Sequence, residues 1–132
     1  MRSGLRTAFA LAASLIAASA VAQSPDARFV NPARFMAATG EGLYADVCQG
    51  CHMPEGVGAS GAGAYPALAR NPKLAAAGYP LALVLRGRNG MPPFGDLLTD
   101  IQVAAVVNYV RTHFGNHFAD EVTAADAKAA RQ

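Results

Sequence analysis

Both cysteines of the chain fall within five residues, in the stretch Cys48-Gln49-Gly50-Cys51-His52. C-x-x-C-H is the attachment signature of a c-type haem. Two thiols three positions apart on one helical turn lie on the same side, where they can add to two vinyl groups of one porphyrin. His52 then faces the metal with an imidazole nitrogen, a good ligand for haem iron. The motif therefore predicts one covalently attached haem c with His52 as the proximal ligand.

Three other kinds of site share this motif and stay open on the motif alone. A dithiol redox site is typical of a βαβ pattern, which the flanking sequence lacks. A zinc site would use the two cysteines and the histidine of the motif and would need His113 or His117 as its fourth ligand. A disulfide between the two cysteines is compatible with an oxidising compartment.

The amino terminus has the pattern of an export signal. Arg2 and Arg6 precede an apolar run from Ala8 to Ala18, and Ala20-Val21-Ala22 is a small-residue cleavage site. We expect cleavage after this site, a mature protein that begins at Gln23, and localisation in the periplasm. The apolar run is too short for a comfortable membrane span, and nothing later in the chain approaches one. An uncleaved amino-terminal anchor is the alternative.

The positive net charge belongs to this leader. The whole chain carries a formal charge of +2, and removal of Arg2 and Arg6 leaves nine basic side chains against nine acidic ones. No lysine-rich run supports a nucleic-acid partner. The remaining 110 residues give a marginal core by area alone, and a buried porphyrin would supply the missing apolar bulk.

Caps and helical spacing predict an all-α fold with long loops, because no strand pattern appears. A G-x-G-x-x-G match at residues 56–61 lacks the preceding strand and the later acidic residue of a dinucleotide site, so we interpret it as a loop close to the cofactor. The expected helices run from Gly40, capped by Thr39, to about Cys48; from Asn71-Pro72 to Gly78; from Pro80 to Gly87; and from the capping box Thr99–Gln102 to Gly115, with a buried stripe of Val103, Val106, Val107, Val110 and Phe114.

The second axial ligand of the iron has five candidates, which are Met36, Met53, Met91, His113 and His117. Met53 adjoins the motif and does not reach the opposite face of the ring. Met36 precedes the motif, and His113 is expected, like Arg111, on the solvent face of its helix. Met91 lies in a proline-bounded loop thirty-nine residues after His52, where the chain can cross over the ring. We therefore predict Met91 as the distal ligand; an ordinary buried methionine is the alternative.

The sequence resembles class I cytochromes c over most of the mature chain. The residues that carry the resemblance are Gly40, Leu43 and Tyr44 before the motif, then Pro66-Ala67-Leu68, Gly90-Met91-Pro92 and Val106-x-x-Tyr109-Val110. The resemblance implies that the helix before the motif crosses the carboxy-terminal helix near Gly40, Tyr44 and Tyr109. It also implies that the carbonyl of Pro66 binds the other nitrogen of His52 and fixes the orientation of the ring.

A closer resemblance is to the cytochrome c subunits and domains that accept electrons from periplasmic dehydrogenases. The similar stretches are residues 65–72, 91–95, 108–112 and 122–126. Those subunits carry several haem units, whereas this chain has one motif. The resemblance implies a small single-domain fold wrapped around one haem. We divide the chain into a signal peptide (1–22), an amino-terminal extension (23–38), a cytochrome c domain (39–115) and a carboxy-terminal tail (116–132).

Ligation by His52 and Met91 leaves no open position on the iron, which predicts a one-electron carrier without catalytic residues. The rival is a haem enzyme or gas-binding sensor with a displaceable Met91. Between Glu55 and Asp96 the only charged side chains are Arg70, Lys73, Arg86 and Arg88, which would pair with haem propionates or steer an acidic partner. The expected donor is a periplasmic dehydrogenase, and the expected acceptor is a cytochrome oxidase or another cytochrome. The protein is either a free shuttle or a subunit held by its tail.

Overall fold

The structure, a computed structural model, describes residues 35–61 and 63–132, within a unit that comprises residues 31–132. The predicted signal peptide, its cleavage site and most of the amino-terminal extension lie outside these residues. Within the described part of the chain, no helix has both the length and the apolar character needed to cross a bilayer.

The first helix is a continuous run of three segments, α1 (Gly40–Leu43), the π-helical turn η2 (Tyr44–Cys48) and α2 (Gln49–His52). Thr39 begins it as predicted, because its side chain accepts a hydrogen bond from the amide of Gly42 at 3.1 Å. The helix continues one turn beyond the expected end at Cys48, so both cysteines and His52 lie on helical backbone. The wide π turn ends on Cys48, the first residue of the motif, and π turns are frequent at functional sites.

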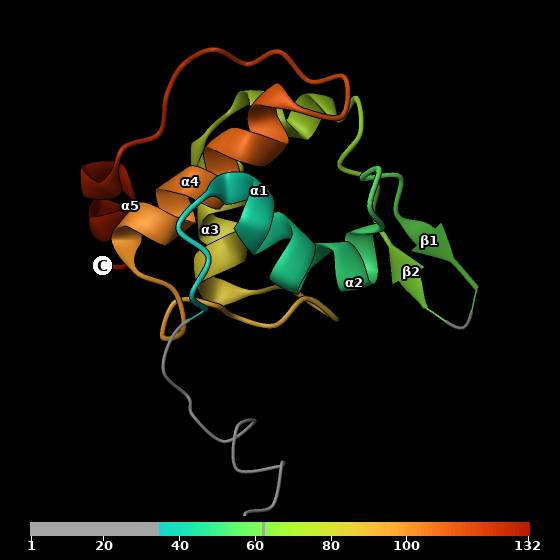
Figure 1. Ribbon diagram of the computed structural model, residues 1–132, viewed down its shortest axis with the longest axis horizontal. Helices are drawn as coiled ribbons and strands as arrows, with labels where there is room; N and C mark the ends of the chain where they lie inside the picture. Colours follow the sequence, from blue (N-terminus) through green and yellow to red (C-terminus); the bar gives the residue numbers. More distant parts are fainter. Residues whose placement is uncertain (1–34, 62) are drawn as a thin grey trace, which may run out of the picture. The chain divides into compact units, whose positions relative to one another are not determined.

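This helix crosses α4 (Asp100–Thr112), the longest helix in the described part of the chain (Figure 1), and Gly40 lies at the crossing. A Cβ at Gly40 would stand 2.2 Å from the carbonyl oxygen of Ala105 and 2.7 Å from the Cβ of Tyr109. One turn on, the rings of Tyr44 and Tyr109 lie 5.6 Å apart. The predicted crossing near Gly40, Tyr44 and Tyr109 is confirmed, and it depends on a residue without a side chain.

Between the motif and α4 the chain forms short elements. A hairpin of two-residue strands, β1 (Ala59–Ser60) and β2 (Ala64–Tyr65), projects from the helices in Figure 1. The 3-10 helix η3 (Pro72–Ala75) follows, capped by the side chain of Asn71, and then α3 (Gly78–Arg86). Gly78 begins α3 instead of ending the preceding helix. Pro80 fits inside the first turn of α3, because the amides there have no helical partner to lose.

Helix α4 has the predicted capping box, in which Thr99 and Gln102 exchange hydrogen bonds between side chain and backbone. It ends at Thr112, three residues before the predicted stop, because Phe114 and Gly115 have φ of 57° and 77° and turn the chain back. Phe114 is therefore half-buried beyond the helix instead of lying in its stripe. The other predicted positions join the core, which comprises Leu43, Tyr44, Leu74, Leu81, Leu85, Leu98, Val103, Ala104, Val106, Val107, Val110, Val122 and Ala127.

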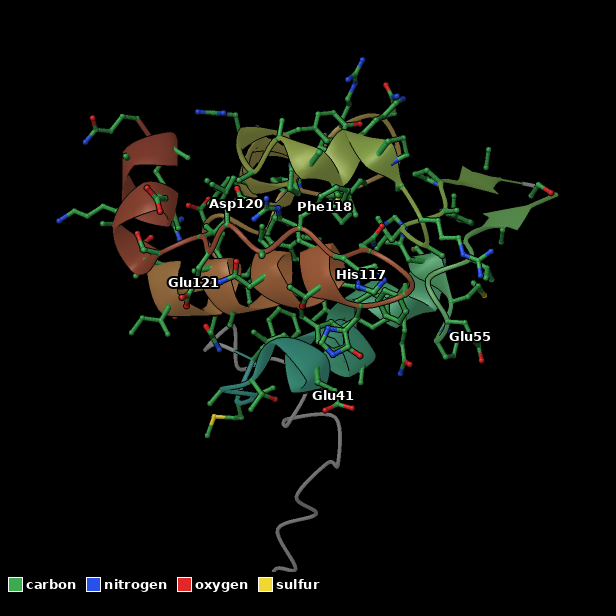
Figure 2. The ribbon with its side chains drawn as sticks, turned by 90° about the horizontal axis from the view of Figure 1, so that it is seen from above. Glu41, Glu55, His117, Phe118, Asp120 and Glu121 are labelled. Atoms are coloured by element: carbon green, nitrogen blue, oxygen red, sulfur yellow. The ribbon has the colours of Figure 1, made fainter. Side chains whose placement is uncertain are left out.

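The last residues return along α4, and Figure 2 shows this segment at Phe118, Asp120 and Glu121. The side-chain amide of Asn108 on α4 holds it by two hydrogen bonds of 2.8 Å to the backbone of Val122, donating to its carbonyl and accepting from its amide. Thr123 then caps α5 (Ala124–Ala130), which packs on α3 and α4. Since Val122 and Ala127 are buried, residues 116–132 contribute to the core of this unit.

Arg111 is fully buried, so the expectation that it lies on the solvent face of its helix is wrong. Its guanidinium donates to the carbonyls of Leu74 and Ala75 in η3 and to both the carbonyl and the carboxylate of Asp120. The bond to Arg111 holds the pKa of the Asp120 carboxyl below its usual range. One buried arginine thus links α4, η3 and the returning carboxy-terminal segment, and every nitrogen has a partner.

The helix crossing generates a prediction about stability. Gly40→Ala places a methyl group against the backbone of Ala105, and we expect a loss of about 1–3 kcal/mol in the free energy of unfolding, as for other overpacked sites. Urea denaturation measures it. The matched control is Gly50→Ala, because a Cβ at this helical glycine meets no atom within 4 Å. Equal stability of the two variants would show that the two helices separate at no cost.

Candidate functional site

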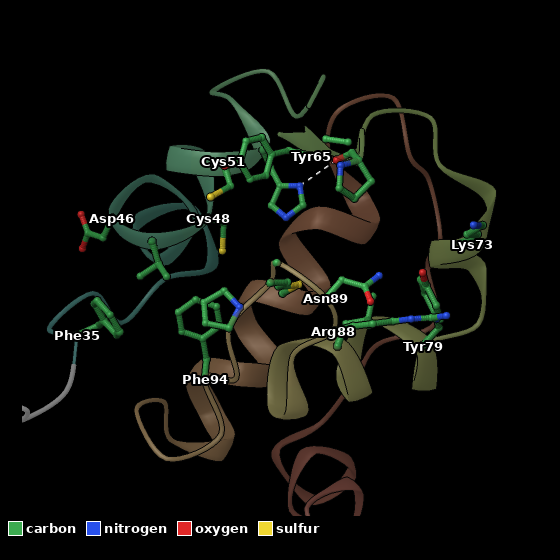
Figure 3. A pocket seen from close by; sticks show the side chains of 18 residues that line it. Phe35, Asp46, Cys48, Cys51, Tyr65, Lys73, Tyr79, Arg88, Asn89 and Phe94 are labelled. Atoms are coloured by element: carbon green, nitrogen blue, oxygen red, sulfur yellow. Dashed lines mark hydrogen bonds between the residues drawn. The ribbon is translucent and has the colours of Figure 1, made fainter. Parts of the chain in front are cut away.

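A cavity of about 560 Å³ opens between the first helix, the hairpin and α3 (Figure 3). Its volume is within the range of about 300–1,000 Å³ that is usual for cofactor and small-molecule sites. Cys48, Cys51, His52, Pro66 and Met91, all five predicted site residues, lie in its wall. A smaller hollow of about 160 Å³ shares His52 and Met91 with it and extends to the core residues Leu74, Val106 and Val110.

His52 is the last residue of α2 and is buried. Its Nδ1 lies 2.9 Å from the carbonyl oxygen of Pro66, the hydrogen bond drawn as a dashed line in Figure 3. A carbonyl only accepts, so Nδ1 carries the proton and donates. Nε2 is then left with its lone pair free, which is the form of the ring that binds a metal.

Gly58 holds the two partners of this hydrogen bond together. Its amide donates to the carbonyl of His52 at 3.0 Å. Its φ is +69°, and a Cβ there would stand 2.3 Å from the carbonyl oxygen of Tyr65 and 2.8 Å from the carbonyl carbon of Pro66. In the loop of residues 56–61, glycine therefore allows close backbone packing beside the motif. The sequence pattern alone did not indicate this role.

The two cysteines, three positions apart on the helix, point their sulfur atoms into the cavity (Figure 3). Both are free thiols; Cys48 is half-buried and Cys51 is exposed. Burial, with a smaller contribution from Cys51, raises the pKa of the Cys48 thiol to about 11, so this thiol is protonated at neutral pH.

Met91 enters the cavity wall from a loop fixed on the end of α3. Arg88 and Met91 exchange backbone hydrogen bonds of 2.9 and 3.0 Å. Gly87, with φ of +68°, lies so close that a Cβ would stand 2.5 Å from the carbonyl oxygen of Met91. Two consecutive prolines, Pro92 and Pro93, follow and restrict the backbone further.

The other candidate ligands lie elsewhere. Met36 has 92% of its surface exposed, and the ring of His113 binds the carbonyl of Tyr109. Met53 follows His52 in a left-handed conformation, with φ of 65°, and is absent from the cavity wall. His117 is exposed on the segment that follows α4 (Figure 2). Among the residues that the structure describes, no group of three or more His, Cys, Asp or Glu side chains is placed to hold a metal ion.

The basic side chains between positions 56 and 95 lie in different surroundings. Lys73 and Arg88 lie in the cavity wall, on the side that Figure 3 shows opposite Cys48 and Cys51. Arg86 turns away and donates to the backbone carbonyls of Ala130 and Gln132. Arg86 is exposed, and these two bonds use part of its hydrogen-bonding capacity within the chain.

Several residues of the cavity wall are not among the predicted site residues. Tyr79 and Asn89 add polar groups beside the basic side chains, and Phe35 and Phe94 add apolar surface near the first helix (Figure 3). Phe35 is held there by Gln102, whose amide donates to its carbonyl at 2.6 Å. For Asn89 the sequence held one signal, since an asparagine followed by a glycine is typical of a turn. The structure agrees, with a φ of 53° at Asn89.

The donor set suits a haem. Thiols for covalent attachment and an imidazole with one free nitrogen lie on one wall, a thioether lies on another, and the lining between them is mostly apolar. The basic side chains at the mouth complement the carboxylates that a haem carries.

Comparisons with known proteins agree with this geometry. The family described as cytochrome c oxidase, cbb3-type, subunit III matches residues 35–110. The gluconate 2-dehydrogenase cytochrome c subunit of Pantoea cypripedii is 35% identical over 108 residues. That alignment covers 71% of this chain and 24% of the relative, so the chain spans about a quarter of the relative's length.

The matched residues begin at Phe35 in the cavity wall and end at Val110 in the core, so they include the motif, the proline loop and most of α4. The all-α fold agrees with this match. The chain therefore belongs to the cytochrome c domains of the cbb3-type oxidase subunit III family, whose members carry haem c, and it resembles the cytochrome subunits of dehydrogenases.

Proposed function

We propose that the protein is a single-haem c-type cytochrome that carries one electron at a time in the periplasm. The observation that carries the proposal is that Cys48, Cys51, His52 and Met91 line the same cavity. The haem, when bound, supplies an iron that alternates between two oxidation states. The chain supplies attachment, orientation and an apolar surrounding.

Each residue has a distinct role in this proposal. Cys48 and Cys51 attach the haem by thioether bonds, and His52 binds the iron through Nε2. The carbonyl of Pro66 holds the imidazole by accepting a hydrogen bond from Nδ1, which strengthens the ligand. Met91 would supply a thioether ligand from another wall of the cavity, and such a ligand favours the reduced state of haem iron. With both positions filled, the protein has no place for a substrate on the iron and carries out no bond chemistry.

The proposed electron donor is a dehydrogenase, because the relative named above is the cytochrome subunit of one. The acceptor in this proposal is a cytochrome oxidase or another cytochrome of the respiratory chain. Lys73 is exposed and Arg88 lies beside it in the cavity wall, so positive charge surrounds the mouth near the exposed haem edge. An acidic surface on the partner would be steered to that mouth.

Covalent attachment of a single haem is tested by intact mass. The purified exported protein should gain the mass of one haem and begin at Gln23, and its haem absorbance should survive denaturation and acid extraction. The double variant Cys48→Ala/Cys51→Ala should lose the haem under the same treatment. Metal analysis that finds zinc and no iron would rule out the proposal.

Ligation by Met91 is tested by Met91→Ala. We expect the variant to lose the methionine-to-iron charge-transfer band, to have a lower reduction potential and to bind carbon monoxide in its ferrous form, because one axial position is opened. Met36→Ala is the matched control, since Met36 lies outside the cavity wall and is exposed. Rapid and complete binding of carbon monoxide by the wild-type protein would instead favour a sensor or enzyme.

Electrostatic docking is tested by charge reversal at the mouth. Lys73→Glu should slow reduction by the native donor toward the unsteered range of about 10⁵–10⁶ M⁻¹s⁻¹ and leave the haem spectrum unchanged. The effect should shrink as ionic strength rises from 0.01 to 0.1 M, because the Debye length falls from about 30 to about 10 Å. Lys128→Glu on α5 is the control with equal charge change. Equal rates for the two variants at low salt would contradict steering at the cavity mouth.

A further inference from the structure

Two arginines connect α5 with the segment that carries Met91, one in each direction. Arg86, the last residue of α3, donates to the carbonyls of Ala130 and Gln132, at 2.6 and 3.3 Å. Arg131, which follows α5, donates to the carbonyls of Gly95 and Leu98. The two side chains thus cross between the carboxy-terminal end of the chain and the loop after α3.

Besides Arg131, backbone hydrogen bonds to α3 and the burial of Leu98 in the core hold the loop after Met91. The amides of Phe94 and Gly95 donate to the carbonyls of Val84 and Leu85, at 2.9 and 3.1 Å, which occupies carbonyls in the last turn of α3. Gly95 has no room for a side chain there, because a Cβ would stand 2.8 Å from the carbonyl oxygen of Leu85. The outward carbonyl of Gly95 is the one that Arg131 binds.

Arg131 is itself fixed in place. Its Nε lies 2.5 Å from a carboxylate oxygen of Asp100, the first residue of α4, and Asp100 is about two-thirds buried, with 31% of its side chain exposed. The guanidinium therefore bridges three elements, which are the start of α4, the loop after Met91 and the end of α5. Five donors in a rigid plane suit arginine to this role, and a lysine would not reach the same set of acceptors.

We propose that Arg131 is a positioning residue for Met91, and that its bonds to Gly95 and Leu98 oppose the movement of this loop away from the cavity. The inference rests on the proposed ligation of iron by Met91. A methionine can leave the iron by rotation of its side chain or by outward movement of its loop, and this proposal concerns the second route. That movement must break either the bonds of the loop to α3 or those to Arg131, and hydrogen bonds from a charged donor are the stronger kind.

The direct test is competition by imidazole for the distal position of the ferric haem protein. Arg131→Ala should bind imidazole about tenfold more tightly than wild type, equivalent to about 1.4 kcal/mol, because opening of the loop becomes easier. Its methionine-to-iron charge-transfer band should weaken at lower imidazole concentrations. Arg131→Lys keeps the positive charge but loses the planar set of guanidinium donors. Its imidazole affinity should lie between those of wild type and Arg131→Ala.

The matched control is Lys128→Ala, which removes one positive charge from an exposed side chain of the same helix. It should bind imidazole as wild type does. Hydrogen exchange provides a second readout, since the amides of Met91, Phe94 and Gly95 should exchange faster in Arg131→Ala and remain unchanged in Lys128→Ala.

The outcomes separate the two proposals. If wild-type protein shows the methionine-to-iron band and Arg131→Ala matches Lys128→Ala in imidazole affinity, Arg131 is only structural and this inference is wrong. Lower thermal stability of Arg131→Ala without a change in imidazole affinity leads to the same conclusion. If the wild-type band is absent, ligation by Met91 is wrong, and the positioning role falls with it.

Discussion

The hydrogen bond from Nδ1 of His52 to the carbonyl of Pro66 is the contact on which the site depends. Because a carbonyl cannot donate, this one bond decides which nitrogen of the imidazole is free to bind a metal. Gly58 closes the arrangement by binding the carbonyl of His52 while its backbone touches Pro66. The helix that carries the cysteines and the loop that faces it are thereby held at one fixed separation, with the cavity between them.

Local sequence signals predicted the parts of the fold that depend on local physics. The caps at Thr39 and Thr99 satisfy amides three residues away, and the valines of α4 bury one face of a single helix. Such interactions span a few residues, so the spacing of residue types reveals them. The spacing of the motif is informative for the same reason. Two cysteines and a histidine within five residues lie close together on any helix, whatever the rest of the fold.

The features that were missed or misread depend on partners far along the chain. Arg111 looked like a surface residue because its acceptors, in η3 and at Asp120, lie outside its own helix. Arg86 looked available for a partner because its acceptors are backbone carbonyls at the other end of the domain. Carbonyls are present at every position, so no residue pattern shows which of them an arginine will bind. The role of Gly58 was hidden for a related reason, because a close backbone approach requires only the absence of a side chain.

The use of arginine against backbone carbonyls also determines how the structure responds to acidity. A guanidinium stays protonated throughout the range in which proteins fold, and a carbonyl oxygen does not titrate. The acceptors of Arg86 and Arg131 are backbone oxygens, apart from one carboxylate oxygen of Asp100. The bonds to backbone carbonyls therefore keep a charged donor and an acceptor that does not titrate, without relying on histidine pairs or on a balance of surface charges.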